Sequence, residues 1–194
     1  MTEHFPSRSE TFVVEHATGL VARGYTVTVI SKGPGPSISA DELKSLSDMG
    51  LNLVSIQGLG PSRVCNLLKV FKYALKCPQL IRCFFDRGPW SPSELLVAYL
   101  YLQAIHNDSP DIVHIHFGNH AGLMCQVGLD LPTVATWHGA EAKQLPKIRG
   151  KGMYDVLFAT NTIHTVGSRH MENCLLDLGC RDGQTACIPM GVDL

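Results

Sequence analysis

The sequence lacks the features that mark membrane, secreted, repeat and nucleic-acid-binding proteins. It has no CxxC pair, no internal repeat and no low-complexity tract. No segment approaches the ~18 to 20 uninterrupted apolar residues of a membrane-spanning helix, and the polar start MTEHFPSRSE lacks the apolar core of a signal peptide. The net charge is −1, so no basic field marks a nucleic-acid partner. We therefore expect a soluble cytoplasmic protein that binds no nucleic acid.

The cysteines give no sign of a disulfide framework. There are seven, an odd number, and most sit among apolar residues. This arrangement favours free thiols in a reducing compartment. The GxSxG pattern of a nucleophile elbow is also missing, which argues against a Ser-His-Asp hydrolase. At 194 residues the chain suffices for one sizeable domain.

Helical and strand patterns alternate along the chain. Capping-box spacing at Ser7 and Glu10 predicts the start of a first helix, and Gly24 predicts its end in a left-handed conformation. An apolar helical pattern over 63–85 is interrupted at Pro78. The other predicted helices cover 39–50, 91–108, 119–130, 153–161 and 169–179. The predicted strands cover 25–31, 51–57, 111–117, 132–138, 163–168 and 185–191.

Several of these strands are apolar on both faces. DIVHI and TVATW are examples, and strands of this kind belong to a parallel sheet covered by helices on both sides. The sequence therefore predicts an α/β fold with a Rossmann-like, doubly wound parallel sheet.

The segment DIVHIHFGNH carries His114, His116 and His120 within seven residues. A zinc hydrolase could use such a cluster, but the spacing is HxHxxxH, and Gly118 and Asn119 stand where an acidic residue would be expected. Catalytic zinc needs three protein ligands and supporting carboxylates. We therefore expect no metal ion at these three residues, and we expect His114 to be a hydrogen-bonded histidine of the strand.

His116 and His138 have a different setting. Each follows an apolar strand and stands close to a glycine. Ligands of open α/β sheets bind at the carboxyl ends of strands. The two histidines are therefore candidates for one shared polar crevice.

Four segments resemble one family. FPSRSETFVVEHATGLVARGYTVTVIS is similar to the amino-terminal signature of family-four retaining glycosyltransferases of the exopolysaccharide and colanic-acid type. DIVHIHFG resembles the family's HxHFG strand end, and TVATWHGAE resembles its histidine-glycine segment. VGSRHMENCLLDLGC followed by CIPMGVDL is similar to the exit from the family's first domain.

The resemblance implies one half of a GT-B architecture, in which two Rossmann-like domains face each other across a cleft. It implies transfer of a sugar from a UDP- or GDP-linked donor to a saccharide or lipid-linked acceptor, in polysaccharide biosynthesis, without a metal or other cofactor. It also implies that His138 is the catalytic residue. The residues implied in donor binding are Ser7, Arg8, Ser9, Glu10, Gly139 and Glu141. Those implied in acceptor binding are His116, Phe117 and Gly118.

The chain departs from the family pattern at both ends. Only MTEH stands where the family has its first strand, and the chain ends at GVDL, where the second domain would begin. We therefore expect 1–194 to be a single acceptor-side domain without the nucleotide-sugar domain, and to be inactive alone.

The segment KQLPKIRGKG gathers four basic residues, Lys143, Lys147, Arg149 and Lys151. The simpler interpretation is a solvated loop. The functional one is contact with anionic lipid headgroups, at about 1 kcal/mol per basic residue, which would place the protein at the inner membrane face.

Three functions stay open on the sequence. They are an acceptor-side transferase domain, a metal-dependent hydrolase that uses the three clustered histidines, and a non-catalytic Rossmann-like binding module.

Overall fold

The computed structural model describes residues 1–56, 88–189 and 191. It is an α/β fold whose described strand pairs are all parallel. One sheet pairs β1 with β2, and the other has the order β3-β4-β5-β6. The strands are β1 (Val27–Ser31), β2 (Leu51–Ser55), β3 (Val113–His116), β4 (Thr133–Trp137), β5 (Ile163–Val166) and β6 (Thr185–Cys187).

The amino-terminal segment (residues 1–5) lies between the two sheets. The Thr2 amide donates to the Ile30 carbonyl of β1 at 3.3 Å, and the His116 amide of β3 donates to the Met1 carbonyl at 3.1 Å. With this segment counted as the first strand, the order across both sheets is 3-2-1-4-5-6-7, which is the 3-2-1-4-5-6 order of a Rossmann fold extended by one strand. The few residues before FPSRSET therefore stand where the family has its first strand.

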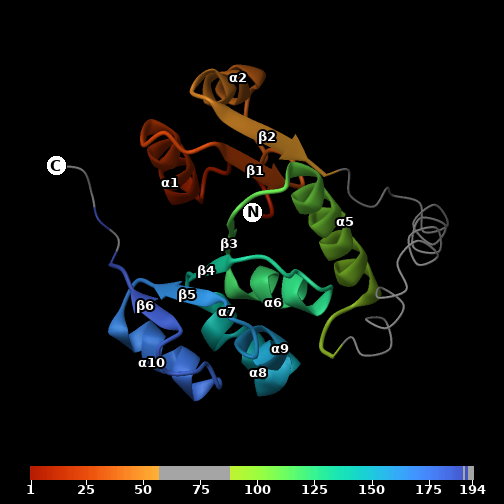
Figure 1. The fold of residues 1–194 in the computed structure, drawn as a ribbon, viewed down its shortest axis with the longest axis vertical. Helices are drawn as coiled ribbons and strands as arrows, with labels where there is room; N and C mark the ends of the chain where they lie inside the picture. The colour runs from red at the N-terminus through yellow and green to blue at the C-terminus, as the bar shows by residue number, and fades with distance from the viewer. Residues whose placement is uncertain (57–87, 190, 192–194) are drawn as a thin grey trace.

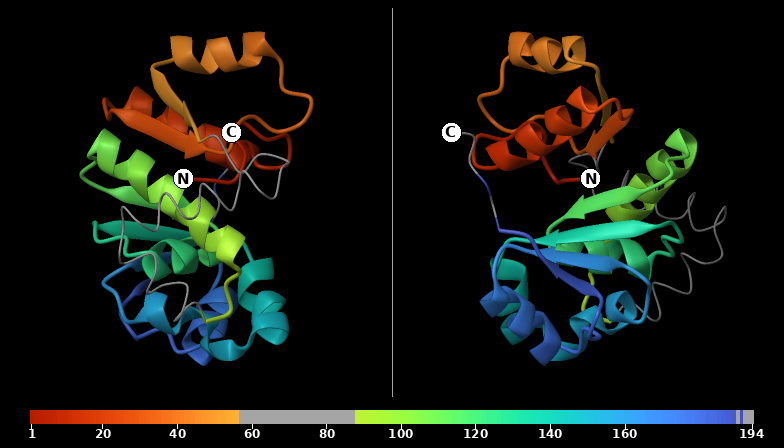
Figure 2. Two further views of the ribbon diagram at one scale, coloured as in Figure 1. Left: turned by 90° about the vertical axis from the view of Figure 1, so that its right-hand side faces the viewer. Right: turned by 60° about the vertical axis from the view of Figure 1, so that its left-hand side comes forward.

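Helices cover both sides of the strands, as the apolar strands predict. Helix α1 packs on β1 and β2, and α10 packs on β5 and β6. Helix α5 contacts β1 and α6, while α6 contacts β3 and β4. Figure 1 shows this arrangement, and in the right-hand view of Figure 2 α1 and α10 lie on one side of the strands and α5 on the other. These helices are α1 (Thr11–Ala22), α5 (Pro92–Asp108), α6 (Gly118–Gln126) and α10 (Arg169–Asp177).

Two helices begin where the sequence predicts, and one begins at a later residue. Helices α2 (Ala40–Asp48) and α5 both begin with a reciprocal capping box, formed by Ser39 with Glu42 and by Ser91 with Glu94. The capping box predicted at Ser7 and Glu10 is wrong. Helix α1 begins only at Thr11, and its N-cap Glu10 makes no side-chain cap, because its carboxylate accepts the Thr2 hydroxyl at 3.1 Å. Gly24 has the predicted left-handed conformation, with φ of 88°.

The region after β4 contains more helix than the sequence predicts. The KQLPKIRGKG segment is not an open loop, since the proline in it starts a short helix rather than preventing one. The sequence predicts one helix over 153–161, and the structure has a 3-10 turn followed by a single helical turn. The elements here are α7 (Ala140–Lys143), α8 (Leu145–Arg149), η1 (Lys151–Tyr154) and α9 (Asp155–Phe158).

Several expectations concern segments only partly covered by the structure. The helical pattern over 63–85 with its break at Pro78 lies outside the described residues, as does most of GVDL.

The four described cysteines, Cys125, Cys174, Cys180 and Cys187, are free thiols, as the sequence predicts. Across 1–56 and 88–189, no helix has the length and apolar character needed to span a bilayer.

Candidate functional site

Four histidines converge at the carboxyl end of β3 and β4. His114 and His116 alternate along β3, so their rings lie on the same side of the strand and stack with centroids 4.6 Å apart. Helix α1 brings His16 to 4.6 Å from the His114 ring. The His138 ring stacks 5.6 Å from His116, and its Nε2 lies 3.3 Å from His116 Nδ1. His116 and His138 thus lie side by side, with Phe12 and His16 of α1 packed against them, while the shared polar crevice stays a prediction.

Burial keeps these rings neutral. Desolvation lowers the pKa of His114 to about 3 and that of His116 to about 2, with smaller contributions from neighbouring charges. Burial also lowers the pKa of His16. It lowers the pKa of His138 as well, against the opposing effect of the Glu141 carboxylate. At neutral pH the cluster therefore offers uncharged imidazoles, which can donate or accept hydrogen bonds.

His114 is hydrogen-bonded within the sheet, as predicted. Its Nε2 lies 2.7 Å from the Thr136 hydroxyl of β4, which in turn lies 2.6 Å from the Thr165 hydroxyl of β5. This chain of contacts crosses three neighbouring strands and fixes the orientation of the ring. His116 is more deeply buried, at 6% exposure, so little of its surface is open to solvent.

His138 is held by the turn that follows β4. Its backbone amide donates to the Glu141 carboxylate at 2.6 Å, and the Tyr154 hydroxyl donates to the Glu141 carbonyl at 2.7 Å. Glu141 is 2% exposed, so its carboxylate shapes this turn. Gly139 has φ of 125°, a conformation that side chains rarely adopt. Glu141 and Gly139 thus place His138 at the strand end.

The His138 ring is more closely packed than its position in the sequence indicates. The ring centroid of Phe12 of α1 lies 4.5 Å from that of His138, and the ring centroid of Phe117 lies 4.6 Å from it. Nδ1 of His138 has no hydrogen-bond partner among the described residues. The ring is thus fixed by aromatic neighbours while one nitrogen remains available to a substrate.

Gly118 has a packing role that the sequence does not reveal. A side chain at this position would meet the Trp137 ring at 2.3 Å. The preceding Phe117 has φ of 71°, which turns the chain from β3 directly into α6. Gly118 therefore allows α6 to start in contact with the buried Trp137.

Four of the predicted donor residues, Ser7, Arg8, Ser9 and Glu10, lie in the turn before α1. Arg8 is well exposed and pairs with Glu42 of α2 at 2.9 Å. The Ser7 hydroxyl lies 3.2 Å from that of Ser9. Since α1 also carries Phe12, which contacts His138, the start of this helix lies on the same side of the sheet as the histidine cluster.

His120 does not join the other histidines. Its ring contacts Phe117 edge-on at 5.9 Å and lines a separate cavity of about 360 Å³, together with Glu3, Lys32, Trp90 and Asn119. Its Nδ1 is buried without a hydrogen-bond partner among the described residues. The set His114, His116 and His120, which the hydrolase hypothesis requires, is therefore not brought together.

This cavity lies at a favourable place in the fold. Glu3 belongs to the central amino-terminal segment, Lys32 follows β1, and Asn119 and His120 belong to the first turn of α6, after β3. The strand order reverses here, and ligands of doubly wound sheets bind at this position. Lys32 and Glu3 form an ion pair of 2.6 Å at its wall. Sequence reasoning missed the cavity, because its residues are scattered over elements far apart in the chain.

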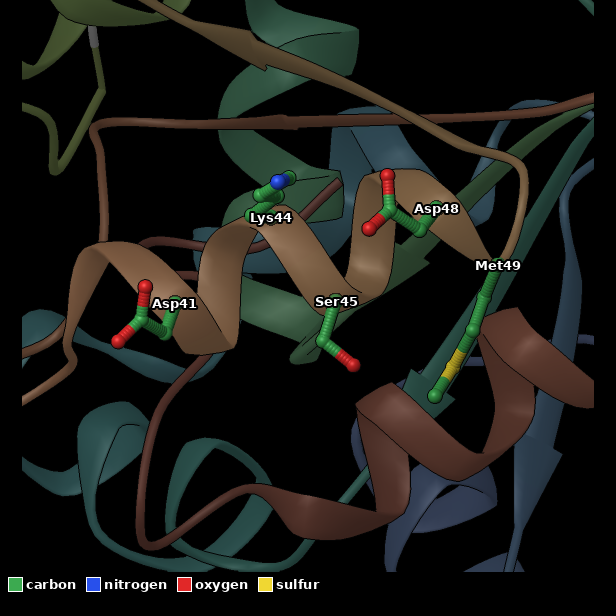
Figure 3. Close-up of a pocket in the computed structure, with 5 residues that line it drawn as sticks. All are labelled: Asp41, Lys44, Ser45, Asp48 and Met49. Atoms are coloured by element: carbon green, nitrogen blue, oxygen red, sulfur yellow. The ribbon is translucent and has the colours of Figure 1, made fainter.

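A second hollow lies along α2 (Figure 3). Its lining residues are Asp41, Lys44, Ser45, Asp48 and Met49. They come from one helix and its C-cap and include none of the predicted site residues, so we assign no function to this surface.

The four basic residues after β4 divide into two groups. Arg149 donates to the Glu94 carboxylate at 2.8 Å and lies 5.2 Å from the centre of the Trp90 ring, so it is part of the packing between α8 and α5. Lys143, Lys147 and Lys151 are exposed, and Ile148 beside them is 78% exposed. Only the three lysines are thus available for contact with another surface.

Comparison with known proteins gives one result that bears on function. The family model described as Glycosyltransferase Family 4 matches residues 9–194. A search of curated proteins gave no match. The matched range includes the start of α1, the strand-end histidines and the cavity-lining residues of α5 and α6. Since this range covers nearly the whole chain, the protein belongs to Glycosyltransferase Family 4.

Proposed function

We propose that residues 1–194 form the acceptor-side domain of a retaining glycosyltransferase with the GT-B architecture. It takes part in the transfer of a hexose from a UDP- or GDP-linked donor to a saccharide or lipid-linked acceptor in polysaccharide biosynthesis. The observation that carries the proposal is the placement of His138. The ring packs against Phe12 and Phe117 at the carboxyl end of β4, on the side of the sheet where α1 starts.

The chemistry of the transfer gives each part a role. Positive charge develops at the anomeric carbon of the donor, and negative charge develops on the leaving diphosphate. The backbone amides at the start of α1 can donate hydrogen bonds to the diphosphate, and the Arg8 guanidinium adds a positive charge that attracts it. His138, kept neutral by burial, donates a hydrogen bond from its free nitrogen to the reacting sugar. Ser7, Ser9, Glu10, Gly139 and Glu141 shape the donor side, and the transfer needs no metal ion or other cofactor.

We assign the acceptor side to the cavity lined by His120, whose ring contacts Phe117. Its ion pair, the Asn119 amide and the unpaired His120 nitrogen offer the mixed donors and acceptors that sugar hydroxyls require. His116 and Gly118, both buried, act by positioning Phe117 rather than by contact with the acceptor.

The proposal is tested with the enzyme that carries this domain together with a nucleotide-sugar domain. Incubation with UDP- and GDP-sugars and saccharide acceptors should give a glycoside whose anomeric configuration, measured by NMR, matches that of the donor. A product of inverted configuration, or hydrolysis of the donor without transfer to any acceptor, would contradict it.

His120→Leu tests the assignment of the acceptor cavity. We expect KM for the acceptor to rise about three- to tenfold, the scale of one lost hydrogen bond, with a smaller change in kcat. The melting temperature should stay the same or rise, because leucine leaves no unpaired nitrogen buried. Steady-state kinetics and thermal melts measure both effects. His106→Leu, at an exposed position of α5, is the matched control. A lower melting temperature with unchanged KM would assign His120 a structural role only.

Membrane contact is proposed through the three exposed lysines near α8, which places the protein at the inner face of the membrane. Replacing Lys147 by alanine should lower partitioning onto vesicles containing anionic lipid about fivefold, since one basic residue near such a surface contributes about 1 kcal/mol. Cosedimentation with and without anionic lipid measures this. Arg149→Ala should mainly lower the melting temperature, because its guanidinium packs on Trp90. Equal binding of Lys147→Ala and the parent protein would refute the contact.

A further inference from the structure

Three histidine side chains approach one another closely beneath α1. His16 comes from the middle of α1, and His114 and His116 come from β3. One ring nitrogen of each lies within 4.8 Å of the corresponding nitrogen of the other two. We propose that His16, His114 and His116 form a binding site for a single divalent transition-metal ion that prefers imidazole ligands, with Zn²⁺ as the representative ion.

The geometry is close to what zinc requires. A Zn–N bond of about 2.1 Å in a tetrahedral site separates two ligand nitrogens by roughly 3.4 Å. The nitrogens of the three histidines therefore need to approach by at most about 1.4 Å. His16 is exposed on α1 and can approach by rotating its side chain. The stacked His114 and His116 rings must also tilt so that both direct a nitrogen toward the ion. Three protein ligands leave a fourth position for water or another ligand.

The surroundings also fit a metal site. A ligand histidine is also oriented by a hydrogen bond from its other nitrogen. His114 has such a bond with Thr136, and His116 has one with His138. The exposed position of His16 gives an ion a path from solvent.

This site differs from the one that the sequence suggested. The spacing of His114, His116 and His120 is wrong for zinc, and His120 lies in the other cavity. The third ligand is instead contributed by His16, about 100 residues earlier in the chain. The inference does not depend on the proposed transferase function. If both hold, an ion at this site lies one imidazole away from His138.

Calorimetric titration of the full chain with Zn²⁺ tests the site. We expect one ion per chain for the parent protein. His16→Ala should weaken binding by roughly 100-fold or more, because the loss of a hydrogen bond to a ligand already costs about 10- to 100-fold. Thr136→Val, which keeps the shape of the side chain and removes the hydroxyl that orients His114, should weaken binding by about 10- to 100-fold. His106→Ala, which removes an exposed histidine on α5, should leave the affinity unchanged.

His16 is exposed, so His16→Ala should keep the melting temperature of the parent protein in metal-free buffer, which separates loss of a ligand from loss of the fold. Failure of the parent protein to bind Zn²⁺, or binding by His16→Ala as tight as that of the parent, would overturn the proposal. So would binding that is lost in His106→Ala, since it would identify scattered surface histidines as the ligands. None of these results would bear on sugar transfer, because a failed titration leaves the assay of anomeric configuration unaffected.

Discussion

His138→Ala should lower the turnover of the enzyme that carries this domain by roughly 100-fold or more. This is the scale of losing one preorganised hydrogen-bond donor at a charged transition state. The Phe12 and Phe117 rings fix the imidazole, so the donor is already in position before the reaction starts. The free energy of unfolding should fall by less than about 2 kcal/mol, because the ring is only half-buried and leaves a small void. Steady-state rates and thermal melts measure the two effects.

His114→Ala is the matched control for this prediction. The two rings have the same chemistry and lie in the same cluster, but the His114 ring is bound through Thr136 to the neighbouring strand. Its loss should therefore cost more stability than that of His138, and turnover should fall by less than about tenfold. If His138→Ala loses stability to the same extent as His114→Ala while keeping normal turnover, His138 is a structural residue and the proposed mechanism is wrong.

Gly118→Ala should be strongly destabilising. The added methyl group would lie 2.3 Å from the Trp137 ring, and that ring has little freedom to move. Trp137 is 2% exposed, donates its indole N–H to His164 at 3.2 Å and packs edge-on against Tyr154. Helix propensity favours alanine over glycine by about 1 kcal/mol. The overpacking cost of about 3 kcal/mol outweighs this gain and leaves a net loss of about 2 kcal/mol. The melting temperature should therefore fall by roughly 4 to 8 °C.

Gly167→Ala is the control for this second variant. A side chain at Gly167 would have no heavy atom within 4 Å, so the same substitution should leave the melting temperature nearly unchanged. Should Gly118→Ala melt at the same temperature as Gly167→Ala, then α6 and Trp137 can separate without cost, and the close approach is not needed for stability.

The order and type of the main elements follow from the sequence because their causes are local. Helix α5 covers the predicted range almost residue by residue, since its proline, its cap and its apolar positions lie within it. The apolar strand over 132–138 becomes β4 for a similar reason, because β-branched and apolar side chains suit a buried parallel strand. Family membership also depends on motifs in chain order, which the sequence displays directly.

The same local reasoning fails where tertiary contacts compete. Ser7 and Glu10 have the spacing of a capping box, as do Ser39 and Glu42, yet only the second pair forms one. The Glu10 carboxylate instead accepts the Thr2 hydroxyl of the amino-terminal segment. The helical start in the basic segment was missed because a proline within it suits the first turn of a helix as well as a loop.

The parallel α/β fold, the strand-end positions of His116 and His138, and the family can all be inferred along the chain. These properties depend on periodicity and on the residues that follow each strand. Which histidines meet depends instead on how the elements pack in three dimensions. His120 turns into the cavity at the switch point, and His16 takes its place beside His114 and His116. The physical reason is that spacing fixes the direction of side chains on one element, whereas the packing of α1 on the sheet fixes which other element they face.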